Sequence, residues 1–391
     1  MSVNASQQVK RLADLATIER DGIAPGSIKS GTLSVGLENI TGDGEFFGVG
    51  PVEAGQLAST KFSFSSKHLL YGKLRPYLRK IARPDFDGIC STDILPILPS
   101  PEIDRNFLFH YLRQDVMIAR ANSLTSGANL PRLSPRSLAE FPIPLLPIAE
   151  QQRIAAILDR AESLRAKRRQ ALAKLDSLTQ SIFVDVFGDL NTNPKSWPMR
   201  DIGWAVRVEG GFAFKSEDFA SVGSGIIRIS NLVQGKVDLA DIARMPADKI
   251  DKGGRFRVLA GDILMAMSGA TTGKIGVMPS DLTEPLYQNQ RVGSFRITDP
   301  TRMRREFLLA LLGSRFYQKS LWQAAAGVAQ PNVSSGQLES ISVFFPPIEL
   351  QDAFASQIKV IEQLKSRQQT SLCKLDQLFA SLQHRGFEGK L

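Results

Sequence analysis

The sequence has few of the residues that bind metals or form cross-links. It contains two cysteines, Cys90 and Cys373, and three histidines, His68, His110 and His384. No CxxC motif occurs, so the usual spacing of a structural zinc site is missing. Two cysteines far apart in the sequence are typical of reduced thiols in the cytoplasm. We therefore expect no bound metal and a cytoplasmic location.

Long hydrophobic runs are also missing. No apolar segment approaches the roughly 18 residues that a membrane-spanning helix requires. The N-terminal stretch MSVNASQQVKRLADL lacks the apolar core of a secretory signal. With 391 residues, 43% hydrophobic and 22% charged, the chain is long enough for two or three domains with cores of their own. We expect no membrane partner.

The charge is unbalanced towards the basic side. The formal net charge is +9, and more than half of the excess lies in residues 191–348. A basic balance favours polyanionic partners, nucleic acid first. The alternative is that the charge serves solubility alone, and the charge by itself does not decide between the two.

One passage of the chain occurs twice. LPIAEQQRIAAILDRAESL at 146–164 has a counterpart, FPPIELQDAFASQIKVIEQL, at 345–364. Pairs that match at a shift of 200 residues include Phe107 and Phe307, Gly127 and Gly327, Pro147 and Pro347, Gln151 and Gln351, and Asp176 and Asp376. Since the match needs no gap, the chain is a tandem duplication of a domain and the helix that follows it.

Each copy ends in a sequence typical of a long helix. Apolar residues recur at alternating steps of three and four, and no Gly or Pro lies between 150 and 187. Pro147 and Pro347 stand just before the two starts, where proline is tolerated. We expect the helices to pair as an antiparallel coiled coil; the alternative is that each packs back on its own domain. The predicted seam consists of Ile157, Ala161, Leu164, Leu175 and Leu178 in the first helix and Ile361, Leu364, Leu375 and Leu378 in the second.

The rest of the chain predicts two strand-rich domains of mixed α/β (α+β) class. Short β-branched and aromatic runs are broken by glycine and proline, and each domain has one helix-like segment, near 104–122 and 301–323. The predicted order is domain 1 at 1–148, long helix 1 at 149–190, domain 2 at 191–348 and long helix 2 at 349–391.

This layout resembles the specificity (S) subunits of type I restriction-modification systems over essentially the whole chain. The resemblance is carried by GANLPRLSPRSLAEFPIPLLPIAEQQ and GVAQPNVSSGQLESISVFFPPIELQ, and by GGFAFKSEDF at 210–219 and GDILMAMSGATTGKIG at 261–276. The first domain departs from the pattern, because its nearest equivalent of GGFAFKSEDF is the divergent ERDGIAPGSIKSG at 19–31.

The resemblance implies a non-catalytic subunit that binds double-stranded DNA. Each target recognition domain would read one half of a bipartite target. The helices would space the domains and dock methyltransferase (M) subunits, and restriction (R) subunits can join. The cofactors, S-adenosylmethionine on the M subunit and ATP and Mg²⁺ on the R subunit, would belong to these partners and not to this chain.

Two short segments resemble motifs of enzymes, one of a methyltransferase and one of a nucleotide-binding protein. FFPPI at 344–348 invites comparison with the methyltransferase motif [DNS]PP[YFW], but it lacks the polar first residue and the terminal aromatic that hold a flipped base. GATTGKI at 269–275 is one residue short of a phosphate-binding loop, and Ile275 stands where Ser or Thr must bind Mg²⁺. We interpret them as a rigid helix lead-in and a glycine-rich turn. A self-contained methyltransferase or nuclease, or a coiled-coil scaffold without DNA readout, remains the alternative.

Basic and amide side chains in glycine-rich loops are the candidates for DNA contact. YGKLRPYLRK at 71–80 interleaves basic residues with tyrosines, and YQNQR at 287–291 holds side chains that read adenine and guanine edges. The alternative is ordinary solvent-facing strands and turns. The candidates are Lys73, Arg75, Tyr77, Arg79, Lys80, Asn129 and Arg132 in domain 1, and Lys215, Ser216, Lys274, Gln288, Asn289, Gln290, Arg291, Gln330 and Asn332 in domain 2.

Overall fold

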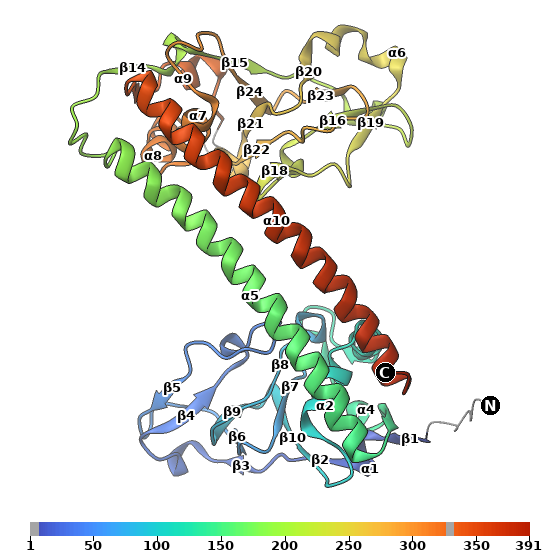
Figure 1. Ribbon diagram of the computed structural model, residues 1–391. Coiled ribbons are helices and arrows are strands. Elements are labelled where there is room, and N and C mark those ends of the chain that lie inside the picture. Colours follow the sequence, from blue (N-terminus) through green and yellow to red (C-terminus); the bar gives the residue numbers. More distant parts are fainter. Residues whose placement is uncertain (1–7, 326–331) are drawn as a thin grey trace. The chain divides into compact units, whose positions relative to one another are not determined.

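The computed structural model describes residues 8–325 and 332–391, which form two compact units. Unit 1 comprises Met1–Gln170 and Gln369–Leu391, and unit 2 comprises Ala171–Gln368. Each unit therefore contains a strand-rich domain and a part of both long helices (Figure 1). The sequence-based division into four consecutive segments treats the helices as separate, and it stays a prediction.

Unit 1 is built on two main sheets, one of four strands in the order β2-β10-β7-β8 and one of five in the order β3-β6-β9-β4-β5. All pairs are antiparallel except β4 with β9. The strands are β1 (Gln8–Arg11), β2 (Ala16–Ile18), β3 (Gly22–Ile23), β4 (Thr32–Val35), β5 (Gly50–Val52), β6 (Lys61–Phe64), β7 (Leu69–Gly72), β8 (Ile81–Ala82), β9 (Gly88–Ser91), β10 (Ile94–Pro99), β11 (Thr125–Ser126), β12 (Arg132–Leu133) and β13 (Pro142–Leu145).

Unit 2 has a six-stranded sheet in the order β15-β24-β21-β22-β18-β17 and a four-stranded sheet in the order β19-β16-β23-β20. Two pairs, β16 with β23 and β18 with β22, are parallel. The strands are β14 (Met199–Asp201), β15 (Val206–Gly210), β16 (Ser224–Ile227), β17 (Leu232–Val233), β18 (Gly235–Val237), β19 (Ala243–Met245), β20 (Arg257–Val258), β21 (Ile263–Ala266), β22 (Ile275–Val277), β23 (Leu286–Gln288), β24 (Val292–Ile297) and β25 (Ser342–Phe344). The mixed α/β class is thus confirmed.

The single helix-like segment predicted in each domain is a pair of short helices. In unit 2 the break falls at Ser314, whose hydroxyl accepts a hydrogen bond from the Tyr317 N–H and starts the second helix. The short helices are α1 (Leu12–Leu15), α2 (Arg105–Leu112), α3 (Asp115–Ser123) and α4 (Pro135–Ala139) in unit 1, and α6 (Ala247–Ile250), α7 (Arg305–Gly313), α8 (Arg315–Ala324) and α9 (Ser335–Glu339) in unit 2.

The two long helices are α5 (Ile148–Phe187) and α10 (Ile348–Phe387). Each starts directly after a proline, as the sequence predicts, and the first ends before Gly188, whose φ of 82° suits a residue that follows a helix. FFPPI is the lead-in to α10, with Phe345 buried against Trp204. Among the described residues no helix is long and apolar enough to cross a bilayer.

A fully buried glutamine ties the start of each long helix to its domain. Gln151 accepts a hydrogen bond from the Asp104 N–H at 2.7 Å and donates to the Glu102 and Leu146 carbonyls at 2.9 and 2.8 Å. Gln351 makes the corresponding three bonds with Arg304, Arg302 and Pro346 at 2.8, 3.1 and 2.9 Å. One buried side chain in each unit therefore satisfies three backbone groups.

Within each unit the beginning of one long helix and the end of the other share a core with the domain. In unit 1, Ile154 and Leu158 of α5 lie in one hydrophobic cluster with Phe379 and Phe387 of α10 and with Phe107 of α2. In unit 2 the same cluster type joins Phe183 and Phe187 of α5 to Phe354 of α10 and Phe307 of α7. In each unit the two long helices therefore contact each other as well as the domain.

The seam predicted from the leucine spacing is partly wrong. Ala161 and Ile361 are buried, and Ile157, Leu175 and Leu375 are half-buried. The exposed fractions of the other four are 42% for Leu164, 44% for Leu178, 40% for Leu364 and 51% for Leu378.

For Leu164 and Leu364 the reason is that a charged side chain occupies the inward position next to each leucine. Arg165 donates to Asp376 at 2.6 Å and lies over the Phe379 ring at 4.3 Å, which turns Leu164 outward. In unit 2 the matching Lys365 contacts Asp176 at 2.9 Å, and Leu364 faces outward. Leucine spacing alone could not distinguish the two faces, because residues one position apart point about 100° away from each other.

Replacing Gln151 by alanine should lower the free energy of unfolding by about 2–4 kcal/mol, because it removes a buried side chain and the three hydrogen bonds that this side chain makes. Gln152, the exposed neighbour, provides the control, and Gln152→Ala should stay within about 0.5 kcal/mol of the parent. Urea denaturation followed by circular dichroism measures both. Equal stability of the two variants would show that the buried amide is not an anchor.

Candidate nucleic-acid interface

Two loops of unit 1 are joined by backbone hydrogen bonds and bring four predicted residues together. The Leu133 N–H donates to the Lys73 carbonyl at 2.9 Å, and the Arg75 N–H donates to the Pro131 carbonyl at 2.8 Å. Leu74 and Arg132 form an isolated β-bridge between these bonds. The turn between β7 and β8 and the loop that ends at β12 thus place Lys73, Arg75, Asn129 and Arg132 in one region.

The basic side chains of this region differ in the number and length of their hydrogen bonds to other residues of the protein. Arg132 is exposed and donates to Asp93 at 3.0 and 3.4 Å, a hydrogen-bonded ion pair that raises the pKa of Arg132. Lys80 donates to the Leu37 carbonyl at 2.6 Å. Arg75 is half-buried and makes one long hydrogen bond, 3.5 Å, to the Asn129 carbonyl.

The tip of the turn is more open. Tyr77 is 50% exposed, and Arg79 forms an ion pair with Asp115 at the start of α3. The tyrosine ring can therefore meet a ligand, whereas the Arg79 guanidinium is partly neutralised. Only part of the basic run at 71–80 is consequently free to contact DNA.

In unit 2 the segments with predicted residues are joined in the same manner. The Met267 N–H donates to the Arg291 carbonyl and the Val333 N–H to the Met267 carbonyl, both at 2.9 Å. Ser268 and Asn332 form an isolated β-bridge. The turn that carries Lys274 therefore lies beside Arg291 and Asn332.

The GGFAFKS segment packs against YQNQR. The Phe212 N–H donates to the Gln288 carbonyl at 3.0 Å, and the Gln290 N–H donates back to the Phe212 carbonyl at 2.8 Å. Only glycine fits at 211, because a Cβ there would lie 2.3 Å from the carbonyl oxygens of Gln288 and Asn289. This close approach explains the second glycine of the GGFAFKSEDF motif.

Most of the predicted side chains of unit 2 lie on the surface. Asn289 is half-buried, and the exposed ones are Lys215, Ser216, Lys274, Gln290, Arg291 and Asn332. The prediction for Gln288 is wrong, because its side chain is 2% exposed and donates to the Glu209 carbonyl at 2.7 Å. Gln330 lies outside the described residues.

Asp93 is a polar residue of the interface that the sequence did not single out. It holds Arg132 and stands directly before the buried strand β10, as Arg291 stands directly before β24. Aligning the two buried strands ILPILP and VGSFRI would have indicated the position.

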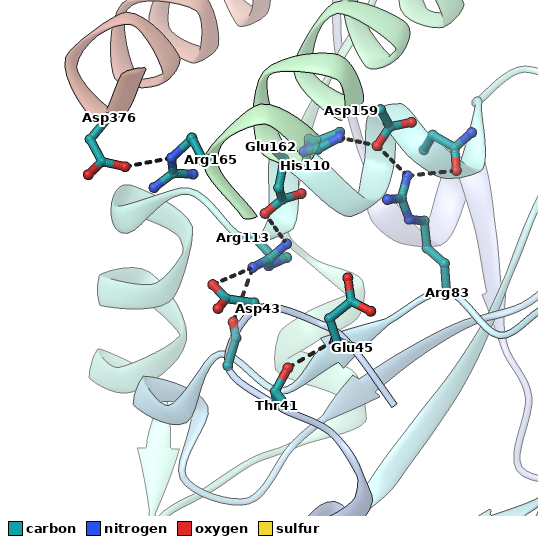
Figure 2. A network of polar contacts seen from close by, with 12 residues as sticks. Thr41, Asp43, Glu45, Arg83, His110, Arg113, Asp159, Glu162, Arg165 and Asp376 are labelled. Carbon is teal, nitrogen blue, oxygen red and sulfur yellow. Dashed lines mark hydrogen bonds and ion pairs between the residues drawn. The ribbon is translucent and has the colours of Figure 1, made fainter. Parts of the chain in front are cut away.

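A second polar cluster of unit 1 lies where α2 meets α5 (Figure 2). His110, Asp159 and Glu162 offer ligand atoms within 4.8 Å of one another. Arg83 contacts Asp159 at 2.8 Å, however, and Arg113 contacts Glu162 at 3.1 Å. Burial tends to raise the pKa of Asp159, but His110 and Arg83 outweigh it and the pKa is lowered. Two guanidinium groups already neutralise the carboxylates, so the cluster fits a salt-bridge network that fixes α5 on the domain rather than a cation site.

A family model described as the type I restriction modification DNA specificity domain matches residues 59–174 and 194–372. The chain belongs to this family. It is a DNA specificity subunit, the class of protein that recognises the target and does not catalyse the reaction.

Named relatives agree with this assignment. The MjaVIII specificity subunit of Methanocaldococcus jannaschii is 26% identical over 293 residues, which cover 71% of this chain and 68% of the relative. The EcoDI specificity subunit of Escherichia coli is 32% identical over 170 residues, 42% of this chain and 35% of the relative. The crystal structure of a type I S subunit from M. genitalium shares the fold, with a TM-score of 0.56, 14% identity and coverage of 99% of this chain and 98% of that one.

Lys274→Ala should weaken binding to cognate and unrelated DNA alike, because an exposed ammonium at a turn tip is suited to a phosphate contact. The slope of log affinity against log salt concentration should fall by about 0.9. Fluorescence anisotropy over a salt series measures it, with exposed Lys359 of α10 changed to alanine as the control. A loss confined to the cognate sequence would contradict a phosphate contact.

Proposed function

We propose that this subunit reads a bipartite DNA target, one half with each unit. The observation that supports the proposal is the pair of joined loops, each of which gathers basic and amide side chains at one place in its unit. Arginine and asparagine are suited to guanine and adenine edges, and lysine to phosphates. Since a subunit of this kind acts where the cell holds its DNA, we place it in the cytoplasm.

We also propose that the chain is an internal duplication whose long helices form an antiparallel coiled coil. Its support is the recurrence of the same contacts at a shift of 200 residues. The three-bond glutamines Gln151 and Gln351 are one pair, and the ion pairs Arg165–Asp376 and Lys365–Asp176 are another. Contacts that repeat with this spacing need both a repeated sequence and helices of opposite direction.

The outward-facing leucines suggest where the methyltransferase subunits bind. Unit 1 exposes Leu164 and Leu378, and unit 2 exposes the matching Leu364 and Leu178. A polar side chain at these positions would suffice for a solvated helix face, so their apolar character is better explained by burial against a partner. Two equivalent pairs of exposed leucines favour two M subunits, and R subunits can join the complex they form.

The cofactors are assigned to the partners. S-adenosylmethionine belongs on the M subunits, and ATP and Mg²⁺ on the R subunits. The family favours this division over a self-contained methyltransferase or nuclease. The gathered basic side chains favour it over a scaffold without DNA readout.

Purified alone with S-adenosylmethionine, the subunit should not methylate DNA, and activity should appear when its M subunit is added. The methylated sites should form a single bipartite motif with an unread spacer. Radiolabelled methyl transfer and methylome sequencing with and without the gene measure these outcomes. Methylation by the pure subunit, or an unchanged methylome after deletion, would contradict the proposal.

Changing Leu164 and Leu378 together to glutamate should release one M subunit from the complex. Each leucine would otherwise contribute about 1.5–3 kcal/mol by burial. The neighbouring exposed residues serve as the matched control, Ser163→Glu with Gln377→Glu, which adds the same charges on other faces of the helices. Native mass spectrometry gives the stoichiometry. Complexes of equal composition from both double variants would show that the leucines are not the docking patch.

A further inference from the structure

The joined loops of the two units share one backbone arrangement. In each unit an N–H donates across the turn between two strands, from Gly72 to Lys80 in unit 1 at 2.8 Å and from Ala266 to Lys274 in unit 2 at 2.9 Å. In unit 1 the Lys73 N–H donates to the Asp93 carbonyl, and the Lys73 carbonyl accepts from the Leu133 N–H, both at 2.9 Å. In unit 2 the Met267 N–H donates to the Arg291 carbonyl, and the Met267 carbonyl accepts from the Val333 N–H, again at 2.9 Å. Asp93 and Arg291 each stand directly before the long inner strand, β10 or β24. We call this arrangement the loop crossing.

The hydrogen bonds define which positions of the two loop crossings correspond. Position 75 matches 269, position 79 matches 273, position 93 matches 291 and position 132 matches 332. Position 133 of unit 1 corresponds to position 333 of unit 2, and both hold a buried apolar residue, Leu133 and Val333.

The outer positions, by contrast, differ in charge. Asp93 corresponds to Arg291, and Arg132 corresponds to Asn332. A fixed backbone with different polar side chains is what reading two different half-sites requires.

Two of the arginines stand in a backbone conformation that disfavours them. Arg75 has φ of 50° and Arg79 has φ of 55°, whereas the corresponding residues of unit 2 are Gly269 and Gly273, with φ of 77° and 87°. Side chains other than glycine's cost free energy there. Since unit 2 shows that the same turn closes with glycine, the arginines of unit 1 are not needed to form it.

Arg79 forms an ion pair within the domain, whereas Arg75 makes only one long side-chain hydrogen bond. Arg79 is paired with Asp115. The Nε of Arg75 is buried and has no hydrogen-bond partner among the described residues, and its Nη2 is 3.5 Å from the Asn129 carbonyl. The other Nη donors of this guanidinium have no partner among the described residues, so they are available to a ligand.

We propose that the loop crossing determines the bases read by each unit, through Arg75 and Arg132 in unit 1 and through Arg291 and Asn332 in unit 2. Arginine matches the O6 and N7 acceptors of guanine, and asparagine matches the N6 and N7 of adenine. Arg75 therefore reads a guanine in one half-site, with Arg132 oriented beside it by Asp93. This inference rests on the proposed function, and it assigns the base specificity of the subunit to these four side chains.

Arg75→Gly gives unit 1 the residue that unit 2 has at the same position, and this makes it a sharp test. Because glycine suits a φ of 50°, the melting temperature should not fall. Discrimination at one base pair of one half-site should drop roughly 10- to 100-fold, while the other half-site stays unchanged. Selection of binding sites from DNA randomised in each half, with the complete methyltransferase complex, measures both halves at once.

Arg136→Ala is the control, since it removes one exposed arginine from the neighbouring helix α4 and should leave both half-sites as they are. Arg291→Ala should relax only the other half-site. An Arg75→Gly complex that selects the parent sequence would overturn the inference, and so would a uniform loss with a smaller salt slope, which marks a phosphate contact. If the parent complex itself selects no bipartite sequence, the proposed function fails instead.

Discussion

The buried glutamine at the start of each long helix is the contact on which the rest of the unit depends. Gln151 bonds to the segment before α2 and to the end of the strand that leads into α5, so one amide fixes three chain segments at once. An amide offers both an acceptor and donors, which no other neutral side chain of this size supplies in this geometry. Without this amide, the Asp104 N–H and the Glu102 and Leu146 carbonyls would lose these hydrogen bonds at the point where the domain joins the helix.

Further along the helices, each unit has an ion pair between α5 and α10 at the same place, with an arginine in unit 1 and a lysine in unit 2. Arg165 bonds to Asp376 and also covers an aromatic ring, whereas Lys365 bonds to Asp176 and to Glu362. Burial lowers the pKa of Lys365, but the two carboxylates outweigh it and the pKa is raised, so the lysine stays charged. In unit 1, Arg83 and His110 hold Asp159, while Ala310 and Lys359 stand at the positions that match His110 and Asp159. The two units therefore keep the ion pair between the long helices with a different cation in each, whereas the contacts of Asp159 occur in unit 1 alone among these two matched sites.

Repetition made the architecture predictable, and local side-chain orientation limited the rest. The shift of 200 residues, the prolines and the absence of helix breakers predicted both long helices, which begin one residue before the predicted segments. Leu164 and Leu364 were placed in the seam because the spacing could not reveal that Arg165 and Lys365 turn inward. Gln288 was taken as a base reader because its residue type fits. Its burial and its hydrogen bond to the Glu209 carbonyl show that its side chain points into the domain. Asp93 went unnoticed because its position is indicated only when the buried strands ILPILP and VGSFRI of the two domains are aligned.

A recognition protein must change the bases it reads without losing its fold, and the loop crossing shows how these two demands are separated. The bonds that hold the crossing run between backbone atoms, from 73 to 93 and from 133 to 73 in unit 1, so they do not depend on the side chains at the outer positions. The apolar residues beneath, such as Leu133, are buried and restricted by packing. Position 75 accepts either a glycine, at no conformational cost, or an arginine, at a cost that its contacts must offset. Variation is consequently confined to positions where it alters hydrogen-bonding groups on the surface and leaves the supporting frame intact.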